Sequence, residues 1–146
     1  MSLNEVGDQL IVLKSKIITD DIILEFANLT GDKNRIHIDD SYAIRNGFKS
    51  LVSHGMLSLS LIIGLMYETG LFDHIIVIFT HLMSVKFLRP VYPNTEISAR
   101  LKVVEKYAAK SGNGTYITVQ VTGFMNEKEI EFVSFEAKFK VLSDNF

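Results

Sequence analysis

An aspartate and a histidine stand five residues apart in the stretch LTGDKNRIHIDDSY, as Asp32 and His37. Helix-like segments flank the stretch, so the loop between them could turn both side chains toward one point. A carboxylate and an imidazole around one water molecule can take up a proton and deliver another, which is general acid–base chemistry suited to adding or removing water. Taken alone, however, the two residues fit an ordinary polar turn better.

A second candidate site is the stretch VSHGMLSLS, where His54 and Gly55 precede a long apolar run. The N-terminus of a helix carries unpaired N–H groups and partial positive charge, so it can hold a carbonyl oxygen on which negative charge develops. Gly55 would let a ligand approach the main chain closely. The alternative is that Gly55 only permits a tight helix entry and His54 only caps nearby groups, and the two residues alone favour it.

Ser60 is a third residue of interest, because its hydroxyl lies in an otherwise apolar segment. Such a serine commonly bonds back to the carbonyl four residues earlier. It could instead orient a catalytic side chain.

Several classes of site find no support in the sequence. The chain has no cysteine, and its histidines show neither the H-x-x-x-H nor the H-E-x-x-H spacing, so we predict no metal site. The G-x-S-x-G, P-loop and dinucleotide-binding glycine patterns are also absent. A net charge of −2 without a basic run argues against nucleic-acid binding.

The 146 residues fit a single domain spanning 1–146, whose N-terminal half is predicted to be helical. A helix is expected in TDDIILEFANLTG, capped by Thr19 and ended by Gly31. A second, short helix is expected in DDSYAIRNG, with Asp39 as its cap and Gly47 as its end. Residues 31–38 are therefore predicted to form a loop.

Residues 56–67 are apolar nearly all round, which predicts a helix buried on most sides. This is the longest apolar stretch and is shorter than the roughly 20 residues needed to cross a bilayer, so we expect no membrane span. The first ten residues show no signal-peptide pattern. These features predict a soluble, cytoplasmic protein.

The C-terminal half is predicted to be extended, because TEISARLKVVEKY, TYITVQVTGF and EFVSFEAKFKV alternate between apolar and polar residues. KSGNGT and MNEKE have the composition of hairpin turns. The early segment QLIVLKSKI and the later segment IIVIFTHLMSVKFLRP can join the same sheet. We therefore predict an α+β fold in which an antiparallel sheet curls around one long central helix.

Three segments together resemble the MaoC-like dehydratase family, which includes (R)-specific enoyl-CoA hydratases. They are FANLTGDKNRIHIDDSYA, GFKSLVSHGMLSLSL and VKFLRPVYPNTEI. The resemblance covers most of the chain and implies a hotdog fold and a homodimer or higher homo-oligomer. It also implies that Asp32 and His37 are the catalytic pair, which reverses the preference for an ordinary turn.

The resemblance assigns roles to further residues. Ser60 aligns with a family serine beside the pair, and Asn34 with an asparagine expected to shape the loop. Gly55 aligns with the helix-entry glycine whose N–H polarises a thioester carbonyl, and the neighbouring His54 is predicted to contact the same carbonyl. The implied reaction adds water to a trans-2-enoyl thioester to give an (R)-3-hydroxyacyl thioester, or removes it. Coenzyme A or an acyl-carrier arm belongs to the substrate, and no separate cofactor or metal is needed.

The sequence departs from the family pattern at two places. Arg35 replaces the usual proline before Ile-His, which would loosen the loop and add a cation. Asn94 and Thr95 replace a Gly-Asp pair, and asparagine tolerates the left-handed conformation that this turn needs. Arg35, Lys86 and Arg89 are candidate contacts for the phosphates of coenzyme A or a carrier arm, although each one singly is more typical of a surface charge.

Two other functions remain open at this level. A hotdog thioesterase would use the same polarised carbonyl, but water would attack the carbonyl carbon. A non-catalytic subunit that binds acyl thioesters would keep the pocket without turnover. A DNA-binding regulator has no support from charge or from an added helical module.

Overall fold

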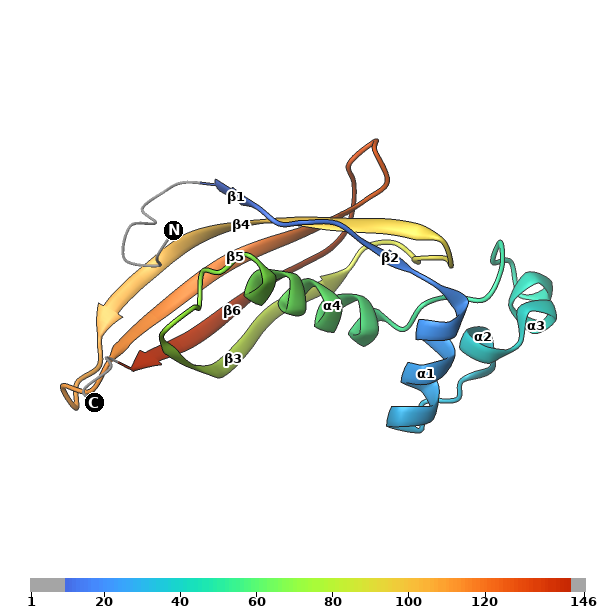
Figure 1. The fold of residues 1–146 in the computed structure, drawn as a ribbon. Helices are drawn as coiled ribbons and strands as arrows, with labels where there is room; N and C mark the ends of the chain where they lie inside the picture. Colours follow the sequence, from blue (N-terminus) through green and yellow to red (C-terminus); the bar gives the residue numbers. More distant parts are fainter. Residues whose placement is uncertain (1–9, 143–146) are drawn as a thin grey trace.

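The computed structural model describes residues 10–142 (Figure 1). The six strands form one antiparallel sheet that curls around α4, and helices α1–α3 gather beyond one end of it. In chain order the elements are β1 (Leu10–Val12), β2 (Lys16–Ile18), α1 (Asp20–Thr30), α2 (Arg35–Ile38), α3 (Asp40–Arg45), α4 (Gly55–Glu68), β3 (Ile76–Phe87), β4 (Thr95–Ala108), β5 (Thr115–Met125) and β6 (Ile130–Leu142). The predicted α+β hotdog fold is confirmed.

The sheet has the strand order β1-β4-β5-β6-β3. The short strand β2 also pairs with β4, at a different part of that strand from β1. Tight turns join β4 to β5 and β5 to β6, in the stretches predicted as hairpins. Gly114 in the first turn has φ of +93°, and a Cβ there would come within 2.2 Å of the Val141 carbonyl oxygen, so the turn requires glycine. The turn residue Asn94, predicted to accept a left-handed conformation, has φ of +61°.

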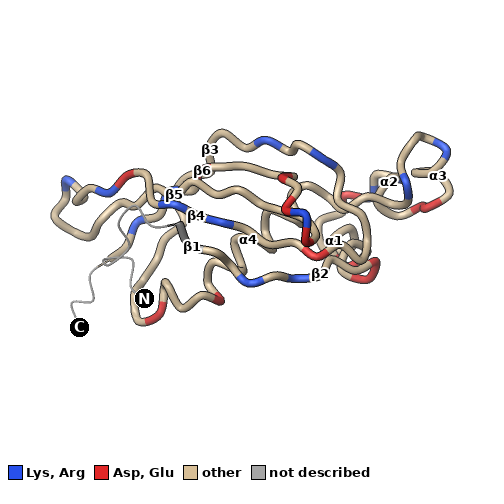
Figure 2. Tube along the Cα trace, turned by 90° about the horizontal axis from the view of Figure 1, so that it is seen from above, with Lys and Arg blue, Asp and Glu red and all other residues tan. Residues whose placement is uncertain are grey.

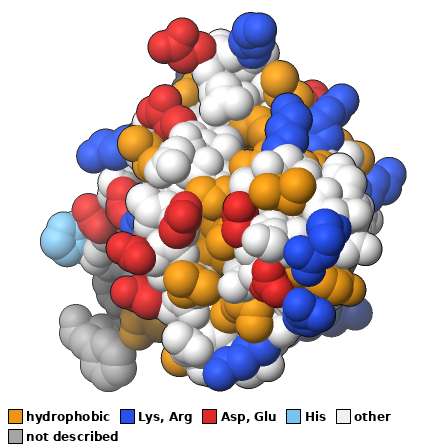
Figure 3. Space-filling view, turned by 90° about the vertical axis from the view of Figure 1, so that its right-hand side faces the viewer, with side chains coloured by type: hydrophobic (Ala, Val, Ile, Leu, Met, Phe, Trp, Pro, Cys, Tyr) orange, Lys and Arg blue, Asp and Glu red, His pale blue; other side chains and the backbone are white. Residues whose placement is uncertain are grey.

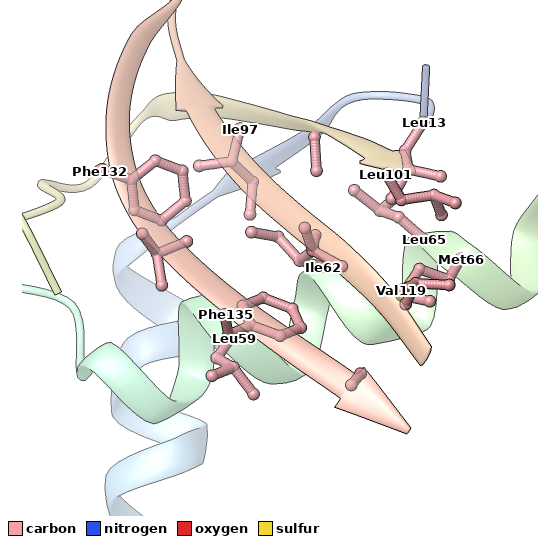
Figure 4. Close-up of a cluster of buried hydrophobic side chains, with 14 of the residues drawn as sticks. Leu13, Leu59, Ile62, Leu65, Met66, Ile97, Leu101, Val119, Phe132 and Phe135 are labelled. Carbon is pink, nitrogen blue, oxygen red and sulfur yellow. The ribbon is translucent and has the colours of Figure 1, made fainter. Parts of the chain in front are cut away.

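The core lies between α4 and the concave face of the sheet (Figure 4). Leu59, Ile62 and Leu65 of α4 are almost completely buried, as the all-round apolar pattern predicts. Alternate residues of β4, β5 and β6 face them because side chains alternate across a strand. Burying one such side chain contributes about 1.5–3 kcal/mol, so this contact fixes the position of α4.

The N-terminal helices begin and end largely where the sequence indicates. The Thr19 side chain accepts a hydrogen bond from the Ile22 N–H at 3.3 Å, and Gly31 ends α1 with φ of +79°. Asp39 caps α3 through the Tyr42 N–H at 2.9 Å. The prediction that residues 31–38 form a loop is wrong in part, because Arg35–Ile38 make the single turn α2. One turn is too short to produce a periodic apolar signal.

Basic and acidic residues are interspersed along the backbone of the described residues (Figure 2). At the end formed by α1–α3, acidic side chains lie among apolar ones and basic side chains lie mainly toward one side (Figure 3). Within residues 10–142, no helix is both long enough and apolar enough to span a membrane.

Candidate active site

A pocket of about 430 Å³ lies at the N-terminus of α4. Its wall comes from the loop before α2, α2 itself, the segment leading into α4, the first turn of α4, the end of β3 with the segment after it, and one residue of β6. The lining residues are Asp32, Ile36, His37, Val52, Ser53, His54, Gly55, Met56, Ser58, Phe87, Leu88, Arg89, Pro90, Val91 and Phe132. Five residues that the sequence singled out, Asp32, His37, His54, Gly55 and Arg89, are therefore brought together.

His37 is held by the segment that leads into α4. Its Nδ1 lies 2.6 Å from the carbonyl oxygen of Val52, and the Val52 N–H donates to the Ile36 carbonyl at 2.8 Å. A carbonyl oxygen only accepts hydrogen bonds, so Nδ1 carries the proton and Nε2 keeps its lone pair. His37 is thus set in the tautomer of a base at Nε2.

The environment of His37 also favours its neutral form. Burial lowers the pKa of His37 below the usual 6.5, and the nearby His54 adds to the lowering. The hydrogen bond to Val52 and the charge of Asp32 act in the opposite direction with smaller effect. His37 therefore stays mostly neutral at pH 6.5 and just below it, so it can still accept a proton there.

Asp32 is exposed and belongs to a tight turn between α1 and α2. Its Oδ1 accepts a hydrogen bond from the Asn34 N–H at 3.3 Å, and its own N–H donates to Thr30 Oγ1 at 3.3 Å. A carboxylate oxygen of Asp32 lies within 4.8 Å of a ring nitrogen of His37. One water molecule can bridge such a separation, because each hydrogen bond spans about 2.7–3.2 Å. Asn34 also caps α2 through the Ile36 N–H, so it shapes this loop.

The donor atoms of Asp32, His37 and His54 are close enough to be considered as metal ligands. The two imidazole rings, however, are stacked with centroids 3.8 Å apart and planes 25° apart. Ring lone pairs lie in the ring planes, so stacked rings do not converge on one ion. This geometry favours proton transfer over metal coordination.

The first turn of α4 presents main-chain N–H groups to the pocket. His54 occupies the N-cap position but makes no side-chain hydrogen bond to the helix, and Gly55 and Met56 line the pocket. These N–H groups are suited to a carbonyl oxygen. A Cβ on Gly55 would come within 2.9 Å of the Phe87 ring. A side chain at this position would therefore force the Phe87 ring to move, a constraint that no sequence pattern indicates.

The structure corrects the placement of the serine. Ser60 is exposed, its hydroxyl donates to the Met56 carbonyl at 2.7 Å, and it is not among the residues that line the pocket. Ser58 lines the pocket instead and lies 3.3 Å from Ser53, oxygen to oxygen. Two residues along a helix differ by about 200° in direction, so the two serines face opposite sides. Motif alignment pointed to Ser60 and missed Ser58.

Of the three candidate cations, only Arg89 reaches the pocket. Its guanidinium donates to the Glu131 carbonyl, which holds it at the rim. Lys86 lies on β3 and does not line the pocket. Arg35 turns away, forming an ion pair with Asp39 at 2.7 Å and lying over the Tyr42 ring at 4.2 Å.

His54 does not take the position expected for a contact to the thioester carbonyl. It is 2% exposed, and its Nε2 lies 2.9 Å from the main-chain carbonyl oxygen of Asp32. Its Nδ1 is buried as well. Sequence reasoning did not single out Phe87, Val91 or Phe132: the first two lie within the segment VKFLRPVYPNTEI without an assigned role, and Phe132 of β6 carries no local signal.

The structure is a hotdog domain with an aspartate–histidine pair beside the N-terminus of its central helix. A family model described as "MaoC like domain" matches residues 2–124, so the chain belongs to this family. The resemblance predicted from three motifs is confirmed.

The relatives agree with this membership. The Bacillus subtilis protein YdeM is 28% identical over 134 residues, 92% of each chain. The solved (R)-hydratase from A. caviae, involved in PHA biosynthesis, is 28% identical, with a TM-score of 0.74 over 93% of this chain and 96% of that chain. A structure described as a monoamine oxidase regulatory protein from Archaeoglobus fulgius has a TM-score of 0.82 at 24% identity, over 94% and 90% of the two chains. The last likeness shows the fold alone.

Proposed function

We propose that this protein adds water to a trans-2-enoyl thioester to give an (R)-3-hydroxyacyl thioester, or catalyses the reverse dehydration. The observation that carries the proposal is the meeting, in one pocket, of the Asp32 carboxylate, the free Nε2 of His37 and the uncapped N-terminus of α4. The similarity to a known (R)-hydratase supports the same reaction class.

In the proposed mechanism, the thioester carbonyl oxygen accepts a hydrogen bond from the Gly55 N–H, which makes the β-carbon electrophilic. A water molecule between Asp32 and His37 bonds to the β-carbon through its oxygen and loses a proton to His37 Nε2. His37 passes this proton to the Asp32 carboxylate, which delivers it to the α-carbon on the same face as the carbon–carbon double bond becomes single. Both groups thereby return to their starting protonation states. Dehydration follows the same steps in reverse.

The pocket suits a thioester with an extended handle. Its rim carries Arg89, which could meet a phosphate of coenzyme A or a carrier arm, and its inner wall is apolar, with the buried Val91 and Phe132. The proposed reaction needs no metal or redox cofactor, because the polarising group and both proton carriers belong to the chain. We place it in fatty acid metabolism, in the cytoplasm, a reducing compartment that suits a chain without cysteine.

We also propose a homodimer. The outer edge of β3 has no partner strand within the described residues, and Ile76, Ile78 and Phe79 on this strand are exposed. A long edge strand with apolar side chains is a surface on which a second copy can pair.

The test is the loss of enoyl-thioester absorbance with crotonyl-CoA and a longer trans-2-enoyl-CoA, with a thiol reagent run in parallel. Hydration by the wild type should fall by about 10²–10⁴-fold in Asp32→Asn, the range by which a general acid–base group contributes. Asp32 is exposed, so this variant should remain as stable as the wild type. Thiol release without hydration would instead indicate a thioesterase. Tight binding with neither reaction, repeated with carrier-protein thioesters, would indicate a non-catalytic subunit.

A further inference from the structure

One buried side chain, His54, touches both members of the acid–base pair. Its Nε2 lies 2.9 Å from the main-chain carbonyl oxygen of Asp32, and its ring stacks on the His37 ring with centroids 3.8 Å apart. On its other side, Phe26 of α1 contacts it edge to face at 5.0 Å. His54 therefore connects α1, the Asp32 turn and α2 to the first residue of α4.

We propose that His54 is a positioning residue, which fixes the Asp32 turn by its N–H and the His37 ring by its face. The inference rests on the proposed hydratase function and goes beyond the expectation that His54 contacts the thioester carbonyl. Neither ring nitrogen of His54 is free for a ligand: Nε2 bonds to the Asp32 carbonyl, and Nδ1 has less than 1 Å² of accessible surface.

The hydrogen bond from His54 to a main-chain carbonyl sets the tautomer of His54, just as the bond to Val52 sets the tautomer of His37. The Asp32 carbonyl can only accept, so Nε2 carries the proton and the neutral ring keeps its lone pair on Nδ1. That Nδ1 is the one buried side-chain nitrogen or oxygen in the described part of the chain that has no hydrogen-bond partner. Buried polar atoms without a partner are rare and destabilising, so a purely structural residue here would be better served by an apolar ring.

Three groups face His37 and together set the position of its ring. They are the Val52 carbonyl from the segment before α4, the Asp32 carboxylate from the turn, and the His54 ring. A displaced His54 would release the ring of His37 on one face and the main chain of Asp32 at the same time. Small displacements of catalytic groups reduce rates strongly, since proton transfer needs hydrogen-bond distances.

Two substitutions separate the contributions of the N–H and the ring. His54→Phe keeps an aromatic ring of similar shape but removes the N–H that reaches Asp32. His54→Gln can place an N–H near the position of Nε2 but removes the ring that stacks on His37. His74→Asn is the control, because His74 is exposed in the turn after α4 and lies outside the pocket, and asparagine accepts its φ of +63°.

The measurements are kcat, KM and the pH–rate profile with crotonyl-CoA, the urea midpoint of unfolding, and amide hydrogen exchange over residues 31–34. In His54→Phe we expect kcat to fall by about tenfold or more with KM little changed. The urea midpoint should change little, because the loss of the hydrogen bond to Asp32 is offset by removal of the unpartnered Nδ1. Exchange at residues 31–34 should accelerate by about tenfold or more. In His54→Gln the acidic limb of the pH–rate profile should shift, because the neighbour of His37 has changed.

Wild-type kcat and wild-type exchange in His54→Phe would overturn the proposal. A fall in kcat that only parallels a fall in the urea midpoint in both variants would also overturn it, since His54 would then be a core residue. If the wild type hydrates no enoyl thioester, the proposed function fails. The exchange of residues 31–34 in His54→Phe then still decides whether His54 fixes the turn.

Discussion

The two ends of α4 are held in place by different kinds of interaction. The second half of the helix, around Ile62 and Leu65, is enclosed by apolar side chains of the curled sheet. The first turn borders a pocket whose buried polar groups, such as His37 and His54, bond to main-chain carbonyls. Apolar packing is non-directional and tolerates small adjustments, whereas each hydrogen bond at the first turn fixes one atom. The core therefore holds the helix, whereas the hydrogen bonds orient the reactive groups.

The largest effect on stability should come from the enclosed half. Leu65→Ala should lower the free energy of unfolding by about 2–5 kcal/mol, because Leu65 is 1% exposed and its removal leaves a cavity. Urea denaturation measures this loss. If the core holds α4 without shaping the pocket, kcat should change little at a temperature where the variant remains folded. A large loss of kcat in the folded variant would show that the core also sets the geometry of the pocket.

Gly55→Ala, unlike Leu65→Ala, should reduce catalytic activity as well as stability. The added Cβ would come within 2.9 Å of the Phe87 ring, so Phe87 must move at the pocket wall. We expect kcat/KM to fall by about tenfold, with a loss of stability of about 1–3 kcal/mol typical of overpacking. Gly64→Ala is the control, because a Cβ at that position of the same helix meets nothing within 4 Å. Equal kinetic effects of both substitutions would contradict a specific role for the first turn.

The pH dependence of stability should report on the buried imidazole. Burial lowers the pKa of His37 in the folded state below the 6.5 of the unfolded chain, so the unfolded state binds more protons just below pH 6.5. Stability should therefore decrease as the pH falls from 6.5 toward the lowered pKa. Urea midpoints between pH 7.5 and about 5, above the range in which carboxylates titrate, measure the slope. His37→Gln should reduce it, and an unchanged slope would mean that another group is responsible.

The smallest effect is expected at Arg35. The side chain turns to Asp39 and Tyr42, away from the pocket, and α2 begins at this residue, where proline is well tolerated. We expect Arg35→Pro to leave KM for an enoyl-CoA unchanged within about twofold. An increase in KM well beyond this would show that Arg35 contacts the ligand after all.

The accuracy of the sequence predictions differs between the same two regions. The buried helix, the alternating strands and the cap at Thr19 were correctly predicted, because each depends on residues close together in the chain. The one-turn helix α2 was missed because four residues show no periodicity. Ser60 was aligned to the site while Ser58 lines the pocket, since a motif gives the order of residues and not the direction in which a helix turns them.

The sequence by itself determined the fold class, the family resemblance and the presence of Asp32, His37 and Gly55 near one site, because local patterns and motif spacing carry this information. Only the tertiary structure decided which nitrogen of His37 is free, that His54 bonds to Asp32 and stacks on His37, and that Phe87 of β3 lies against Gly55. These features depend on hydrogen bonds and contacts between segments far apart in the chain. Their geometry is set by how the sheet and α4 pack, and no short stretch of sequence encodes it.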